Sequence, residues 1–185
     1  MEPGLIDIHT DLIERCRRGE QRAFHDLYKL YSKAMFNIAL RIVNDRAEAE
    51  DVLQESFVSA FRNLDDFQGR STFGAWLKRI VINKSIGQIK RRRFNLVALD
   101  EGTADIGAEE EVDLAEEELQ VGHVRAAIGR LPDGYRIVLS LYLLEGYDHK
   151  EVSEILGITE STSKSQFLRA RHRLKSILKE EFKYA

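Results

Sequence analysis

The chain has one cysteine and only two prolines among its 185 residues. Because Cys16 has no second thiol to pair with, no disulfide can form within the chain, and we expect it to pack as a small apolar residue of the first helix. Apolar runs such as IVLSLYLL are far shorter than the roughly 20 residues of a membrane-spanning helix. The opening residues, MEPGLIDIH, lack the basic and apolar segments of a secretory signal. These absences predict a cytoplasmic protein without membrane insertion.

Sequence motifs of enzymes and metal sites are lacking as well. There is no GxxxxGK loop for phosphates, no HExxH zinc motif and no Cys/His cluster with metal-ligand spacing. The five histidines are dispersed, and we expect most of them at the surface. The chain is therefore expected to use no metal or other cofactor and not to be an enzyme.

Charge is unevenly distributed along the chain, although the net charge is only −3. Residues 100–118 include ten acids and no base, so the 28 bases elsewhere face only 21 of the 31 acids. Two mildly basic segments thus flank an acidic connector, a pattern compatible with binding to nucleic acid.

Helical periodicity recurs throughout, and no stretch shows the sustained alternation expected of strands. Four helices are predicted before the acidic segment, the last from Phe73 to about Lys90, and four after it, at 119–130, 135–144, 149–156 and 161–179. The acidic segment has few large apolar residues and cannot bury enough surface to offset its ordering cost. We predict an all-α fold of two helical domains, residues 1–97 and 117–185, joined by a flexible acidic linker, residues 98–116.

The segment HKEVSEILGITESTSKSQFLRARHRL fits a helix-turn-helix in the C-terminal domain. Gly157 would supply the tight turn, and Thr159 is placed to cap the second helix. On that helix Phe167, Ala170 and Leu174 share an apolar stripe. The other side is short, polar and cationic: Ser161, Lys164, Ser165, Leu168 and Arg169.

This polar side suits the major groove, where Lys or Arg can read guanine and hydroxyls can hold phosphates. Further bases would grip the DNA backbone: Arg171, Arg173 and Lys175. The alternative is an ordinary solvated face on a helical hairpin, but the turn, the cap and the cationic stripe together favour DNA. Ser163 falls on the apolar stripe, and we expect its hydroxyl to bond back to the preceding turn.

A second basic site lies at residues 78–93, KRIVINKSIGQIKRRR, which contain seven bases and no acid. One stripe of the predicted helix carries Arg79, Asn83, Ile86 and Lys90. The preceding loop adds Phe67, Gln68, Gly69, Arg70, Ser71 and Thr72, of which the last two can cap the helix. Basic side chains, an amide and nearby aromatic rings are the groups that bind a single-stranded or flipped nucleobase. Alternatively, Phe73 and Trp76 are core residues and the bases form a solvated surface.

A third surface lies on the helix that precedes this loop. Opposite its apolar stripe, four residues share one face: Asp51, Gln54, Glu55 and Val58. Acids and an amide beside an apolar residue repel DNA but can receive the arginines of another protein. A plain solvated surface is the alternative.

Three stretches carry a resemblance to a known family: AEAEDVLQESFVSAFRNLDDFQG, STFGAWLKRIVINKSIGQIKRRR and LPDGYRIVLSLYLLEGYDHKEVSEILGITESTSKSQFLRARHRL. In this order, with an acidic linker between the last two, the chain resembles the extracytoplasmic-function (ECF) group of bacterial RNA polymerase sigma factors. The resemblance extends from about residue 12 to residue 178.

The resemblance implies roles for the matching positions. Asp51, Gln54 and Glu55 match the DxxQE of the family's helix that docks on the clamp helices of the largest polymerase subunit. Residues 67–72, with Arg79 and Asn83, are similar to the element that captures an unstacked non-template base at the minus-ten region. The positions that read the minus-thirty-five element are matched by Lys164, Ser165, Leu168 and Arg169.

The chain departs from the family at Ser163, where an apolar residue is usual, and at Gln166, where a base is usual. The second change implies a weaker hold on the minus-thirty-five element.

The resulting hypothesis is a sigma factor that binds core RNA polymerase and directs promoter recognition, DNA melting and transcription initiation. Its partners would be core polymerase, promoter DNA and, as for many relatives, an anti-sigma factor. The acidic linker would occupy the cationic RNA path of the polymerase. Two alternatives are a conventional helix-turn-helix DNA-binding regulator and a helical anti-regulator without DNA binding.

Overall fold

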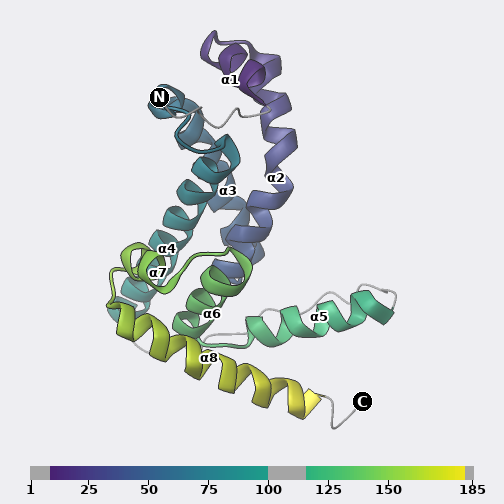
Figure 1. Ribbon diagram of the computed structural model, residues 1–185, viewed down its shortest axis with the longest axis vertical. Helices are drawn as coiled ribbons and strands as arrows, with labels where there is room; N and C mark the ends of the chain where they lie inside the picture. Colours follow the sequence, from purple (N-terminus) through teal and green to yellow (C-terminus); the bar gives the residue numbers. More distant parts are fainter. Residues whose placement is uncertain (1–8, 100–115, 182–185) are drawn as a thin grey trace. The chain divides into compact units, whose positions relative to one another are not determined.

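The computed structural model describes residues 9–99 and 116–181, and the regular elements within these ranges are all helical (Figure 1). The chain divides into two compact units, Met1–Asp100 and Glu101–Ala185. The fold is therefore all-α with two helical domains, as the periodicity predicts. Most of the acidic linker predicted at residues 98–116 lies outside the described residues. Within the described ranges, none of the helices has the length and apolar character needed to cross a membrane.

In its described residues, the first unit contains α1 (Thr10–Arg17), α2 (Gln21–Val43), α3 (Arg46–Arg62), the short 3-10 helix η1 (Leu64–Asp66) and α4 (Phe73–Leu99). Helices α2, α3 and α4 pack against one another, and α1 packs on α2. Their core is formed by buried aliphatic and aromatic side chains, including Leu27, Ile42, Phe73 and Leu77. Cys16 is also buried, as expected for an apolar packing residue.

Local hydrogen bonds set the ends of these helices. Asn44 ends α2 in the left-handed region, with a φ of 58°. The next residue, Asp45, caps α3 by accepting a hydrogen bond from the backbone N of Glu48 at 2.8 Å. Thr72 caps α4 in the same way, because its Oγ1 accepts from the backbone N of Ala75 at 3.2 Å. Of the two caps predicted for α4, Thr72 is therefore the one that acts on its first turn.

Helix α4 is longer than the sequence pattern predicts. It continues to Leu99, so the predicted end near Lys90 is wrong. Residues 91–99, RRRFNLVAL, contain neither glycine nor proline, and the helix therefore meets no local signal to stop.

The described part of the second unit consists of α5 (Glu116–Gly129), α6 (Asp133–Leu139), the π-helical turn η2 (Ser140–Leu144), α7 (His149–Leu156) and α8 (Glu160–Glu181). Helices α5, α6 and α7 all pack on α8, which is the common support of the unit. Arg136 is 3% exposed and joins the corner between α5 and α6. Its guanidinium donates to Leu131 O at 3.1 Å and to the carboxylate of Asp133 at 2.7 Å.

Candidate functional site

Helices α7 and α8 form the predicted helix-turn-helix, and side-chain hydrogen bonds cap the start of each helix. At the start of α7, Glu151 N donates to the Asp148 carboxylate at 2.8 Å, and Asp148 N donates to the Glu151 carboxylate at 2.9 Å. Gly157 ends α7 with a φ of 68°, which favours glycine. Thr159 begins α8, because its hydroxyl accepts from Thr162 N at 3.1 Å. These contacts set both ends of α7 and the start of α8.

The two faces of α8 separate as the periodicity predicts. Ser163, Phe167 and Ala170 are buried, whereas Leu168 is 53% exposed. The exposed face of the first three turns is made of the expected residues: Ser161, Lys164, Ser165, Leu168 and Arg169. The further bases are exposed as well: Arg171, Arg173 and Lys175. A single helix with a polar, cationic side open to solvent has the dimensions to enter a major groove.

Ser163 lies on the buried side of α8 and has no exposed surface. Its hydroxyl is 3.0 Å from Nδ1 of His149, the first residue of α7. The expectation that it bonds back to its own preceding turn is therefore wrong, because the partner comes from the neighbouring helix. His149 also stacks on Tyr142, with ring centroids 4.3 Å apart, and its ring lies 5.5 Å from that of Phe167. A polar pair enclosed by rings thus links the two helices of the motif.

Lys164 forms an ion pair within its own helix. Its Nζ lies 2.6 Å from Oε1 of Glu160, one turn earlier. The hydrogen bond from Lys164 and its positive charge lower the pKa of Glu160, so the carboxyl is ionised at neutral pH. Both side chains are about half exposed, and such surface pairs are weak. The ammonium can therefore exchange Glu160 for another anion.

In the first unit, α4 presents Arg79, Asn83 and Lys90 to solvent. Ile86, the apolar member of the same stripe, is 6% exposed and belongs to the core. The stripe therefore follows the edge of the core, and its polar members form an open basic and amide-bearing surface.

The loop between η1 and α4, residues 67–72, leads into the N-terminus of α4. Its exposed residues are polar or glycine: Gln68, Gly69, Arg70 and Thr72. The ring of Phe67 is buried, with its centroid 5.7 Å from that of Phe73 and 5.4 Å from that of Trp76. Phe73 is wholly buried, in agreement with its interpretation as a core residue. These rings support the loop from within, so the loop offers a ligand its amide, guanidinium and hydroxyl groups.

On α3, the four predicted residues share an exposed face: Asp51, Gln54, Glu55 and Val58. Val58 is 48% exposed, although α3 packs on two other helices. Glu55 is not isolated, since its Oε2 lies 3.5 Å from Nζ of Lys84 on α4. Among the described residues, no group of three or more His, Cys, Asp or Glu side chains could hold a metal ion.

Contacts between distant residues are the part of these surfaces that sequence reasoning missed. Arg17 of α1 donates to the carbonyl of Phe67, 50 positions away, and the pairs of His149 with Ser163 and of Lys84 with Glu55 also join different helices. Periodicity relates residues of one helix and has no information on such pairs. One signal was present, because a serine on an apolar stripe needs a polar partner.

Comparison with known proteins matches each unit to one part of the same family. Residues 27–94 match Sigma-70 region 2, and residues 123–174 match Sigma-70, region 4. The first match covers α3, the loop at 67–72 and most of α4. The second covers α6, α7 and the exposed face of α8. The family matches therefore include the three surfaces described above.

Full-length relatives give the same result. The RNA polymerase sigma-H factor of Pseudomonas aeruginosa is 31% identical over 179 residues, which cover 90% of this chain and 92% of that protein. The ECF RNA polymerase sigma-E factor of Salmonella typhimurium is 33% identical over 172 residues, covering 86% of this chain and 88% of that protein.

A solved structure is similar as well. The sigma factor RpoE of Bartonella quintana, solved in complex with the anti-sigma factor NepR, has a TM-score of 0.64 and 26% identity, covering 84% of this chain and 96% of that one. The alternatives of a conventional regulator and of an anti-regulator are therefore set aside. The chain belongs to the sigma-70 family, in its extracytoplasmic-function group, and is an RNA polymerase sigma factor that binds the polymerase and directs it to promoters.

Proposed function

We propose that the exposed face of α8 reads the minus-thirty-five element of the promoter in the major groove. The observation that carries this proposal is the separation of the two faces of α8: the candidate readers are exposed on the side opposite the buried stripe. Arg169 and Lys164 have the donors that pair with guanine, and Ser161 and Ser165 can hold phosphates. Leu168 offers an apolar contact for a thymine methyl group.

The loop at residues 67–72 and the polar stripe of α4 would act at the minus-ten element. Arg79 and Lys90 supply positive charge for the phosphates of an opened strand, and Asn83 supplies an amide for a base edge. The loop leads into the helix that carries this stripe, and its polar groups are exposed. Capture of one unstacked base would stabilise the melted state, because the closed duplex cannot make this contact.

The face of α3 would dock on the clamp helices of the largest polymerase subunit. Its carboxylates can accept paired hydrogen bonds from arginines, and Val58 gives the centre of the contact an apolar group. Docking then places both DNA-contacting units on one large surface. Two weak contacts that share a support act at a high effective concentration, which explains how modest DNA affinities can suffice.

The remaining partners follow from the same assignment. The acidic segment at residues 98–116 would occupy the cationic RNA path of the polymerase until a transcript displaces it. Since the similar sigma factor of Bartonella quintana was solved with an anti-sigma factor, we propose such a protein as a further partner. The protein would act in the cytoplasm, where the bacterial polymerase works, as a binding subunit and not as an enzyme.

Replacing Arg169 with alanine tests the assignment of α8. The holoenzyme should lose about 1–3 kcal/mol of binding to a promoter with an intact minus-thirty-five element. Lys179→Ala is the matched control, because Lys179 is an exposed base in the last turn of the same helix. Equal losses for the two variants, or no loss for Arg169→Ala, would reject the assignment.

A further inference from the structure

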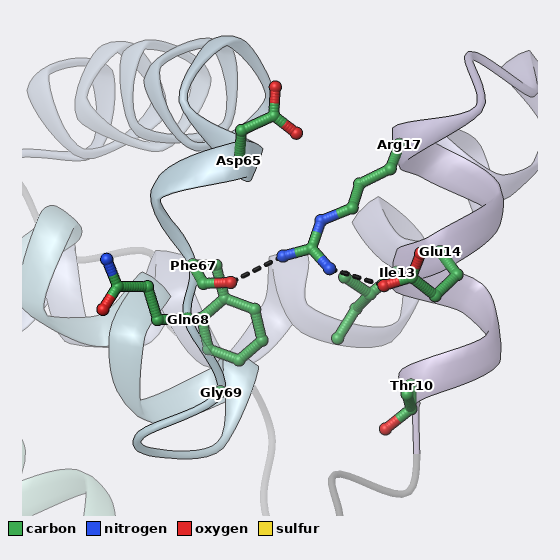
Figure 2. Close-up of a pocket in the computed structure, with 8 residues that line it drawn as sticks. All are labelled: Thr10, Ile13, Glu14, Arg17, Asp65, Phe67, Gln68 and Gly69. Carbon is green, nitrogen blue, oxygen red and sulfur yellow. Dashed lines mark hydrogen bonds and ion pairs between the residues drawn. The ribbon is translucent and has the colours of Figure 1, made fainter.

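The N-terminal helix α1 reaches the loop at residues 67–72 through the side chain of Arg17 (Figure 2). Nη2 of Arg17 donates to the backbone carbonyl of Phe67 at 2.5 Å and lies 3.4 Å from the carbonyl of Leu64. Nη1 pairs with the carboxylate of Glu14, one turn earlier on α1. The guanidinium is therefore oriented by an acid of its own helix while it binds the segment that begins the loop.

A hollow of about 550 Å³ separates α1 from the loop, with Ile13 and Glu14 on one wall and Asp65 and Gln68 on the other (Figure 2). At Gly69 the space is open, since no heavy atom outside the glycine and its two chain neighbours lies within 4 Å of the position that a Cβ would take. Beyond the buried ring of Phe67, the Arg17 guanidinium is a direct polar link from α1 to the loop backbone.

We propose that Arg17 is a positioning residue for base capture: by binding the Phe67 carbonyl, it fixes the loop in the conformation that receives the unstacked base. This inference rests on the proposed role of the loop at the minus-ten element. The physical reason is entropic, because each loop residue that must be ordered upon DNA binding adds to the cost of binding. A loop ordered beforehand by α1 does not have to be ordered at the moment of melting.

Arg17 is well suited to hold the loop and differs from a basic side chain that only binds phosphates at a DNA surface. Its side chain is 29% exposed, and its donors are directed at carbonyls and at Glu14. The planar guanidinium can bind the carbonyl and the carboxylate at once, and an ammonium cannot reproduce this geometry. The structure thus predicts an effect on the order of the loop and on base preference, not on phosphate binding in general.

The test compares Arg17→Gln with Arg18→Gln in holoenzymes reconstituted with core polymerase. Arg18 is the matched control, since it lies next to Arg17, loses the same charge, is 64% exposed and lies 3.7 Å from Glu20. Each holoenzyme is measured on a promoter selected by the wild-type protein, both as a duplex and with the minus-ten region opened by mismatches. Binding to single strands that carry each of the four bases at the captured position is measured in parallel.

For Arg17→Gln we expect opening of the duplex promoter to slow by about tenfold, since a partly buried carbonyl loses its donor. On the mismatched promoter the loss of opening rate should be smaller. The ratio of affinities for the preferred nucleobase and the other three should decrease several-fold. Core binding should stay within about twofold of wild type, because α3 is untouched. Arg17→Lys should fall between wild type and Arg17→Gln, and Arg18→Gln should behave as wild type.

The inference is overturned if Arg17→Gln behaves like Arg18→Gln. It is also overturned if Arg17→Gln lowers thermal stability, core binding and the rate of promoter opening but leaves the preference among the four nucleobases unchanged. In that case α1 only stabilises the fold. Asn83→Ala separates this failure from failure of base capture itself. If Asn83→Ala reduces the preference for one nucleobase over the others and Arg17→Gln does not, only the inference about Arg17 fails. If neither variant reduces this preference, the proposed function of the loop fails too.

Discussion

Replacing Ser163 with alanine removes a hydroxyl that lies 3.0 Å from Nδ1 of His149 in the interior of the helix-turn-helix. A hydrogen bond contributes about 0.5–1.5 kcal/mol net, and a buried group left without its partner costs about 1–3 kcal/mol. His149 is only half-buried, so water can satisfy part of its lost contact. We therefore expect the second unit to lose about 1 kcal/mol of unfolding free energy, equivalent to about 4–8 °C in Tm.

A double-mutant cycle isolates this contact. His149→Phe keeps a ring on Tyr142 but has no nitrogen for Ser163, so Ser163→Ala should cost markedly less in its presence than in the wild type. Hydrogen exchange of the α7 and α8 amides reports on the second unit. The single tryptophan, Trp76, lies in α4 and reports on the first unit, whose unfolding should not change. A coupling energy below about 0.3 kcal/mol would refute the reasoning.

Three further predictions concern other parts of the chain. Burial raises the pKa of the Cys16 thiol, so a thiol reagent at pH 8 should label the folded protein far more slowly than the unfolded one; equal rates would contradict the burial. Glu160→Gln releases Lys164 from its ion pair and removes a negative charge from the DNA-facing helix, so the holoenzyme should bind minus-thirty-five DNA a few-fold more tightly at neutral pH. Weaker binding, measured by fluorescence anisotropy, would mean that Glu160 itself accepts a hydrogen bond from the DNA. Deleting residues 100–116 should impair transcription initiation more than core binding, and unchanged initiation would reject the proposed role of the acidic segment.

The faces of the helices could be predicted from the sequence because each depends on residues of one element. Phe167 and Ala170 are buried and Lys164 and Arg169 exposed simply because an α-helix turns by 100° per residue. The turn at Gly157 is equally local, since its positive φ is a property of that residue.

The prediction failed where the structure depends on contacts between elements or on the absence of a signal. The Ser163 hydroxyl could reach its own helix or a neighbour, and only the packing of α7 on α8 brings His149 to it. Arg17 stands among other bases in the sequence RCRRG, and nothing there indicates which of them turns toward the loop. The predicted end of α4 near Lys90 has no stop signal behind it, because residues 91–99 contain no Gly or Pro, and the helix continues to Leu99.

The proposal that the two units recognise separate promoter elements is tested most directly by mapping transcription start sites. Core polymerase with the wild-type protein, with Arg169→Ala or with Asn83→Ala would transcribe the same library of randomised promoters, and the selected sequences would be compared. We predict that Arg169→Ala relaxes the preference only at the upstream element and Asn83→Ala only near the melted region. If both variants alter the same element, or neither alters any, the assignment of α8 and α4 to separate promoter elements is contradicted.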